Sequence, residues 1–100
     1  LSRGLGDVYK RQGVYATLAN LKGKKFHSIS NIGKAPTFES DRELRVECHL
    51  FDFNEDIYGE LVTIEFVDRI RSEIKFKSIE DLVNQIQLDS QFAKKILKTL

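Results

Sequence analysis

The sequence predicts an all-β fold, a small antiparallel β-barrel that is followed by C-terminal α-helices. Short strand-like stretches recur between residues 13 and 67, turn-forming residues separate them, and helical spacing of apolar residues is confined to residues 78–100. Strands that come first and helices that come last fit an antiparallel sheet or small barrel, not a βαβ unit. The 100 residues, 41% of them hydrophobic, supply one domain at most.

The first two strands form a predicted hairpin. Residues 13–21 place apolar side chains at alternate positions, which suits a strand with one face against a core. The basic run 22–25 contains a glycine and supplies a turn, and residues 26–32 begin a second strand. Residues 31–43 then form a polar loop that contains the only proline of the sequence, and loops of this length often carry function.

The clearest strand covers residues 44–53, and a fourth strand covers residues 61–67. A turn at residues 54–56 separates them, and residues 68–76 connect the fourth strand to the helices. We expect one face of the 44–53 strand to be core and the other to be mixed. The first face carries Leu44, Val46, Cys48 and Leu50, and the second carries Arg45, Glu47, His49, Phe51 and Phe53.

Two C-terminal helices are predicted within residues 78–100. Ser78 precedes apolar residues at helical spacing, and with Asp81 it resembles a capping box that has Asp in place of Glu. A second helical stretch covers residues 90–100, and Asp89 or Ser90 is expected to cap it after a break.

Composition and charge exclude several classes of protein. The formal net charge of +1 gives no bulk electrostatic case for a nucleic acid or a membrane partner. No apolar run approaches the roughly 18 residues that span a bilayer, and the N-terminus lacks the apolar stretch of a signal peptide. A cytoplasmic protein is therefore expected. The lone Cys48 can form neither an internal disulfide nor a cysteine-based zinc site.

Two patterns suggest metal binding only superficially. Residues 52–56 have the acidic spacing of a calcium loop, but Ile57 and Thr63 stand where that motif needs Gly and Glu, so an acidic turn is the better interpretation. His27 and His49 lie on different predicted strands, and nothing places a third ligand near them. We interpret both as packed or half-exposed side chains.

Two further features leave alternatives open. Glu47 lies in the middle of the clearest strand, where it is either the ion-pair partner of a residue such as Arg45 or a placed acid–base group, and the pattern alone favours the ion pair. A basic edge with nearby aromatic residues suits a single-stranded nucleic acid, although a solvated hairpin is the favoured interpretation. That edge comprises Lys22, Lys24, Lys25, Lys34, Phe26 and Phe38.

Six segments, taken in order, carry a more specific signal. They are Gly13-Val14-Tyr15-Ala16, Asn31-Ile32-Gly33 with Pro36-Thr37-Phe38, Val46-Glu47-Cys48-His49-Leu50-Phe51-Asp52-Phe53, Ile57-Tyr58-Gly59-Glu60, Phe66-Val67-Asp68-Arg69-Ile70-Arg71 and Lys75-Phe76-Lys77-Ser78-Ile79-Glu80-Asp81-Leu82. Together they resemble riboflavin kinase, and more narrowly the C-terminal kinase module of the bacterial bifunctional riboflavin kinase and FAD synthetase. The resemblance runs from Gly13 to about Leu97.

The resemblance implies a six-stranded antiparallel Greek-key barrel with a C-terminal helical region. It also implies transfer of the ATP γ-phosphoryl group to the ribityl 5′-hydroxyl of riboflavin, which gives FMN. Glu47 matches the family's catalytic carboxylate in its E-x-H motif, which reverses the interpretation from pattern alone. Flavin contacts are implied for Arg71, Ile74 and Phe76, although many relatives have a polar residue at the position of Ile74. A mobile flap that closes over the reacting groups is implied for Asn31, Gly33, Pro36 and Thr37.

The start of the sequence departs from the family pattern. Relatives carry a glycine-rich opening and a Pro-Thr-Ala-Asn motif, whose Thr and Asn hold magnesium and the ATP phosphates, and neither occurs here. Residues 1–12 are therefore expected to be a non-native leader. Residues 13–100 are expected to be a partial kinase domain that lacks its first strand or strands and holds no metal ligands.

The resemblance also implies partners and cofactors. These are Mg²⁺, ATP as co-substrate, and an N-terminal FMN adenylyltransferase domain in the intact protein, while the chain as given is expected to be inactive. Two alternatives stay open, a non-catalytic flavin-binding fragment and a small nucleic-acid-binding β-barrel.

Overall fold

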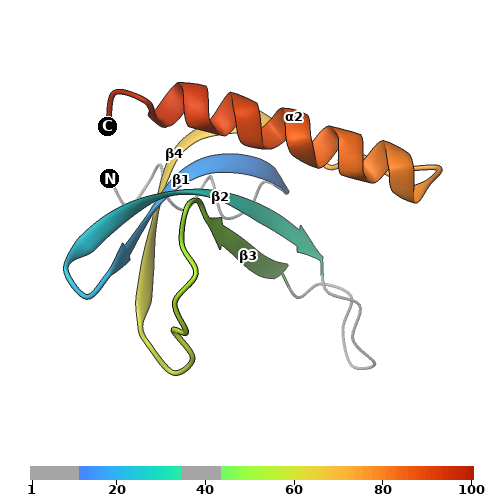
Figure 1. The fold of residues 1–100 in the computed structure, drawn as a ribbon. Helices are drawn as coiled ribbons and strands as arrows, with labels where there is room; N and C mark the ends of the chain where they lie inside the picture. Colours follow the sequence, from blue (N-terminus) through green and yellow to red (C-terminus); the bar gives the residue numbers. More distant parts are fainter. Residues whose placement is uncertain (1–11, 35–43) are drawn as a thin grey trace.

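The computed structural model describes residues 12–34 and 44–100, which form a four-stranded antiparallel sheet and one helix (Figure 1). The strands are β1 (Gly13–Leu21), β2 (Lys24–Lys34), β3 (Leu44–Leu50) and β4 (Val62–Arg71), and the helix is α2 (Ile79–Leu97). Their order across the sheet is β3-β2-β1-β4. The predicted class, antiparallel β-structure with a C-terminal helical region, is confirmed. The four strands described form an open sheet and not the closed six-stranded barrel that the resemblance implies.

β1 lies inside the sheet and pairs along its length with β2 and β4. Its turn to β2 consists of Lys22 and Gly23, with φ of 53° and 79°, the combination that a type I′ turn requires and that matches the twist of the flanking strands. All residues of β1 except one are buried, so the expectation that a single face meets a core is wrong. The reason is that α2 covers one face, while side chains of the curved sheet itself cover the other.

The face of the sheet opposite α2 contains a buried group of hydroxyls. Thr17 Oγ1 lies 2.7 Å from Ser28 Oγ and 2.9 Å from Ser30 Oγ, and Ser28 Oγ donates to the Thr17 carbonyl at 2.9 Å. Tyr15 and Phe66 pack edge to face on this side, with ring centroids 5.2 Å apart. Because the hydroxyls satisfy one another, they can be buried without leaving polar atoms unpaired.

β3 is shorter and β4 is longer than predicted. β3 ends at Leu50 and not at residue 53, because the left-handed backbone of Asp52, with φ of 54°, turns the chain. β4 continues past residue 67 to Arg71, which is still paired with Val14 of β1. This extra length brings Arg71 to the end of the sheet that faces the first half of α2.

Neither face of β3 is uniformly core, and β3 lies at the edge of the sheet formed by the described strands. On the face predicted to be core, Leu50 is buried, Cys48 is half-buried and Val46 is exposed. On the other face, Glu47 and His49 are exposed. The expectation of a core face therefore holds only at the end of β3 that lies nearest the turn.

A single helix occupies the range that was predicted for two. Ser78 is its N-cap, with an extended backbone, and its Oγ accepts a hydrogen bond from the Asp81 N–H at 3.1 Å, which confirms the predicted cap. The predicted break at Asp89 or Ser90 is wrong. Asp89 lies inside the helix because Arg71 of β4 satisfies its carboxylate, so it does not cap a helix N-terminus.

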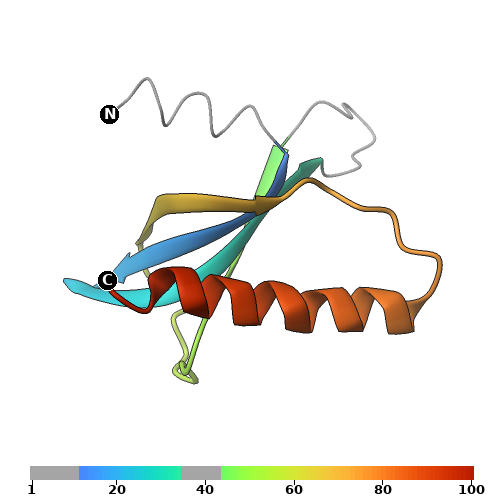
Figure 2. The same cartoon turned by 90° about the horizontal axis from the view of Figure 1, so that it is seen from above.

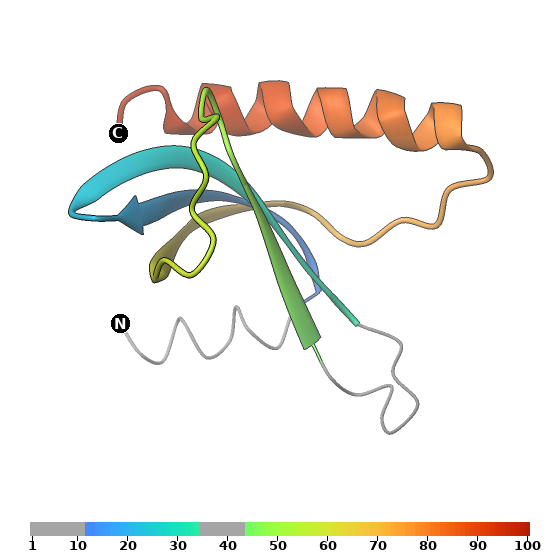
Figure 3. The same ribbon diagram turned by 60° about the horizontal axis from the view of Figure 1, so that its bottom comes forward.

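α2 packs on the sheet through its C-terminal half. Ala93 and Leu97 are fully buried, and with Ala16, Leu18 and Phe51 they form the main hydrophobic cluster. Figures 2 and 3 show the connection from β4 looping outward to the start of α2, so the first turns of the helix lie beyond this cluster. Several apolar side chains of those turns are exposed, namely Ile79, Leu82, Val83 and Ile86. No helix in the described residues is both long and apolar enough to span a membrane.

Candidate functional site

A pocket of about 530 Å³ lies between the first half of α2, the connection 72–76 and the sheet face that α2 covers. Small-molecule sites in proteins have volumes of roughly 300–1,000 Å³. Apolar side chains from the helix and the connection face a more polar wall from the sheet. The lining residues are Val14, Ile29, Ser30, Asn31, Glu47, Cys48, His49, Arg71, Glu73, Ile74, Phe76, Leu82, Ile86 and Asp89.

The fold brings five of the predicted site residues into this pocket. Glu47 comes from β3, Arg71 from the end of β4, Ile74 and Phe76 from the connection, and Asn31 from β2. Asn31 is directly opposite Glu47 in the β2–β3 pairing, so their side chains lie on the same face of the sheet. Residues far apart in the sequence are thus neighbours, while their individual roles stay predictions.

The predicted flap is described only in part. Asn31 and Gly33 lie within β2 and pair with β3, so the expectation that they belong to a loop is wrong. Pro36 and Thr37 lie outside the described residues. A Cβ atom placed on Gly33 would collide with the Glu73 carboxylate. These atoms are the far end of a flexible side chain, so the contact shows that the Glu73 carboxylate lies against β2 at Gly33.

Glu47 has an exposed carboxylate that faces the pocket. Among residues 12–33 and 45–100 it takes part in no salt bridge, whether with Arg45 or with another cation. The structure thus gives no support to the ion pair that the pattern alone favoured. The acceptor oxygens of Glu47 remain available to a ligand.

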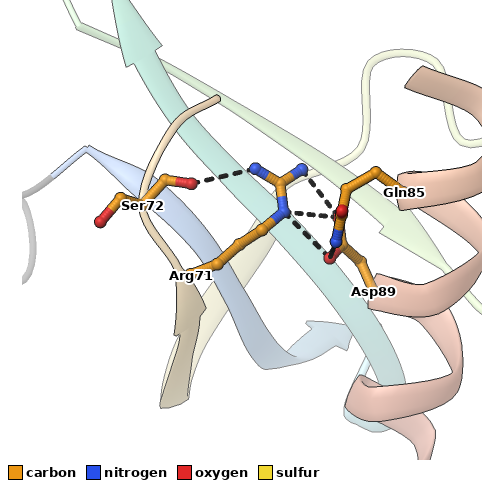
Figure 4. Close-up of polar contacts among 4 residues, drawn as sticks. All are labelled: Arg71, Ser72, Gln85 and Asp89. Atoms are coloured by element: carbon orange, nitrogen blue, oxygen red, sulfur yellow. Dashed lines mark hydrogen bonds and ion pairs between the residues drawn. The ribbon is translucent and has the colours of Figure 1, made fainter. Parts of the chain in front are cut away.

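Arg71 is held in place by a set of polar contacts (Figure 4). Its Nε lies 2.9 Å from both carboxylate oxygens of Asp89, and its Nη2 lies 2.7 Å from Asp89 Oδ2. Gln85 Nε2 donates to Asp89 Oδ1 at 3.0 Å, and Arg71 Nη1 donates to the Ser72 carbonyl at 3.0 Å. The ring of Phe76 lies 5.8 Å from the guanidinium carbon. The arginine is therefore fixed in the wall of the pocket.

Sequence reasoning missed the role of Asp89, although a signal for it exists. Leu82, Ile86, Asp89, Ala93 and Leu97 follow one another at intervals of three or four residues, so they share one stripe of the helix. A carboxylate on an otherwise apolar stripe requires a buried partner. Glu73 was also missed, and the sequence has no signal for it, because its place in the pocket depends on the path of the connection.

The charges that line the pocket are unequal. The positive charge of Arg71 is matched by Asp89, and among the described lining residues no other lysine or arginine accompanies the carboxylates of Glu47 and Glu73. Carboxylates accept hydrogen bonds from hydroxyl groups, and the apolar side chains offer a surface for a flat ring. The described lining therefore suits a compound that combines a flat apolar ring with hydroxyl groups or other hydrogen-bond donors.

Comparison with known proteins gives a consistent result. The Flavokinase family (riboflavin kinase) matches residues 4–97. The bifunctional riboflavin kinase/FMN adenylyltransferase of Haemophilus influenzae is 48% identical over 84 residues, which are 83% of this chain and 27% of that protein. The Bacillus subtilis protein of the same name is 42% identical over 101 residues, which cover 97% of this chain and 32% of that protein.

A solved structure shares the fold as well. A crystal structure of a macrolide-efflux protein from Streptococcus pneumoniae matches with a TM-score of 0.75 at 38% identity, over 83% of this chain and 27% of that one. The chain therefore spans about a third or less of the length of each protein compared. Because the family match extends over nearly all of its residues, the chain belongs to the riboflavin kinase family.

Proposed function

We propose that the pocket between α2 and the sheet binds riboflavin, and that the ribityl 5′-hydroxyl bound there receives the γ-phosphoryl group of ATP to give FMN. The observation that carries this proposal is the presence of Glu47, Arg71, Ile74 and Phe76 in one pocket. Family membership supports the reaction, and the common position of these residues in the pocket supports the proposed role of each.

The isoalloxazine ring is proposed to lie on the apolar wall of the pocket. That wall consists of Ile74 and Phe76 from the connection and of Leu82 and Ile86 from α2. Three of these side chains are exposed in the free protein, so a flat ring would remove their surface from water, which contributes about 25 cal/mol per Å² of apolar area. Arg71 adds N–H donors that suit the carbonyl oxygens of the ring.

Glu47 is proposed to accept the proton of the 5′-hydroxyl. As the 5′-oxygen forms its bond to the γ-phosphorus, the bond from that phosphorus to the β,γ-bridging oxygen breaks, and ADP leaves with the electron pair. The hydroxyl proton passes to the Glu47 carboxylate. The exposed position of Glu47 and its lack of a salt bridge among the described residues support this role. Glu73 offers further acceptors to the other ribityl hydroxyls.

ATP is the co-substrate of the riboflavin kinase family, and magnesium is proposed to accompany it. In the part of the chain that the structure describes, no group of three or more His, Cys, Asp or Glu side chains could hold a metal ion. Each step assigned above uses side chains of this chain alone.

The nucleic-acid alternative loses support from the surroundings of the basic edge. Lys22 Nζ lies 4.0 Å from Glu60 Oε2, and Lys25 Nζ lies 3.4 Å from Glu65 Oε1. Both pairs are exposed and contribute little to stability, yet they place a carboxylate beside two of the four lysines of the edge. A phosphate backbone would have to compete with these carboxylates.

The intact protein is proposed to contain an FMN adenylyltransferase domain as well. Both curated relatives described above carry that activity in their names, and this chain spans 27% and 32% of their lengths. A cytoplasmic location, expected from the sequence, is part of the same proposal.

Replacement of Glu47 tests the proposed reaction. In the complete protein, Glu47→Gln is expected to lower the turnover of riboflavin by at least about 100-fold, because the proton loses its acceptor. The Kd for riboflavin, measured by flavin fluorescence quenching, should stay within about twofold, since the ring contacts remain. The matched control is Glu65→Gln, an exposed carboxylate of β4 that does not line the pocket. Unchanged turnover in Glu47→Gln would remove Glu47 from the mechanism, and a protein that does not bind riboflavin would overturn the site itself.

A further inference from the structure

Asp89 is a buried carboxylate for which the proposed reaction has no use. The residue is 4% exposed, and its oxygens accept hydrogen bonds from Arg71 Nε, Arg71 Nη2 and Gln85 Nε2. A buried ion pair is weak evidence for stability, because well-packed apolar residues in its place are often neutral or stabilising. Stabilisation of the contact between α2 and the sheet therefore does not fully explain why an ion pair is present at this position.

The contacts of Arg71 leave part of its guanidinium unused (Figure 4). Nε serves both oxygens of Asp89, Nη2 makes a further bond to Oδ2, and Nη1 donates to the Ser72 carbonyl. These bonds occupy three of the five N–H groups that a guanidinium carries. Among the described residues, they leave one N–H on each terminal nitrogen of a side chain that lines the pocket.

The ion pair also stands between two hollows of the surface. Arg71 and Asp89 line the proposed riboflavin pocket, and both also line a second hollow of about 470 Å³ that is bounded by Ile70, Leu88 and Phe92. An arginine side chain has several rotatable bonds and, without a fixed partner, could turn toward either hollow. The carboxylate of Asp89, fixed on α2, restricts it to one orientation.

We infer that Asp89 is a positioning residue for flavin recognition, which orients Arg71 so that its remaining N–H groups donate to carbonyl oxygens of the bound ring. This inference rests on the proposed function. Asp89 acts on the ligand through Arg71. Gln85 Nε2 helps to fix Asp89 by donating a hydrogen bond to its Oδ1. A planar guanidinium that is already fixed loses little conformational entropy when it meets a planar, acceptor-rich ligand.

A double-mutant cycle on riboflavin affinity separates this role from simple attachment of the helix. The variants of the full chain are Asp89→Asn, Arg71→Ala and the two combined, with Kd from fluorescence quenching and the folded fraction from circular dichroism. Each single change is expected to weaken binding about tenfold, and the double variant should bind no more weakly than Arg71→Ala alone. The matched control is Asp81→Asn, an exposed carboxylate of α2 outside the pocket, which should bind as the unmodified chain does.

Gln85→Ala provides a milder second variant in case Asp89→Asn does not fold. Gln85 does not line the pocket, so it can affect riboflavin only through Asp89, and about threefold weaker binding is expected. Additive losses in the cycle, or an unchanged affinity in Gln85→Ala, would overturn the inference and leave riboflavin binding intact. Failure of the unmodified chain to bind riboflavin would overturn the proposed function, and the inference with it.

Discussion

Glu47 and Asp89 are carboxylates that line the same pocket, but their surroundings differ. The oxygens of Asp89 are occupied by Arg71 and Gln85 in a buried setting. Glu47 is exposed, and it forms no salt bridge with the described parts of the chain. A carboxylate whose oxygens are occupied can orient a neighbour, whereas one with free oxygens can take a proton. The difference in surroundings thus supports different roles for Glu47 and Asp89, although their acid groups are chemically alike.

Ile74 offers a test of the apolar wall at the level of one side chain. Ile74→Ala is expected to weaken riboflavin binding about fivefold, which corresponds to roughly 40 Å² of lost apolar burial at about 25 cal/mol per Å². The matched control is Ile79→Ala, because Ile79 is 80% exposed and does not line the pocket. Fluorescence titration of the three proteins gives the comparison. Equal affinities would show that Ile74 is not part of the binding surface.

The sequence predicted some of these residues and not others, for identifiable reasons. Glu47, Arg71, Ile74 and Phe76 were found through the ordered motifs of a family, since the pattern alone favoured an ion pair for Glu47. The partner of Asp89 lies 18 residues earlier on another element, where a local helical pattern cannot show it. An acidic residue next to a serine therefore suggested a helix cap at a position where the helix is continuous.

Among the secondary structure elements, the predicted start of α2 was accurate because a local residue decides it, whereas β2 begins at Lys24, two residues before the predicted start at residue 26. The β1–β2 turn follows from two residues with positive φ, and the start of α2 follows from the Ser78 cap. The ends of strands that depend on pairing with a distant strand differ from the predicted ends. β4 continues to Arg71 because β1 is there to pair with it, and β2 continues to Lys34 because β3 pairs alongside.

Two serine substitutions test whether the C-terminal region is one helix. Ser78→Ala removes the N-cap hydrogen bond and is expected to lower the free energy of unfolding by about 1 kcal/mol. Ser90→Ala lies inside the helix and is expected to leave that free energy unchanged or slightly higher, because alanine is the better helix former. Urea denaturation of the two variants gives the values. If Ser90→Ala lowered the free energy of unfolding more than Ser78→Ala does, a helix boundary at Ser90 would be indicated.

Across the whole molecule, the pocket lies where helix and sheet separate. Ala93 and Leu97 fix the C-terminal half of α2 against the sheet, and the connection from β4 leads away before the chain returns as a helix (Figures 1 and 2). Space remains between the first half of α2 and the sheet because only the second half is packed there. The Arg71–Asp89 pair joins the two layers beside this space.

A crystal structure of the chain with riboflavin tests the proposed site most directly. The isoalloxazine ring is expected between the connection and the first half of α2, in contact with Ile74, Phe76 and Ile86. The ribityl 5′-hydroxyl is expected within about 3 Å of a carboxylate oxygen of Glu47. A flavin bound on the sheet face opposite α2, or a ribityl chain directed away from Glu47, would contradict the proposed site and its chemistry.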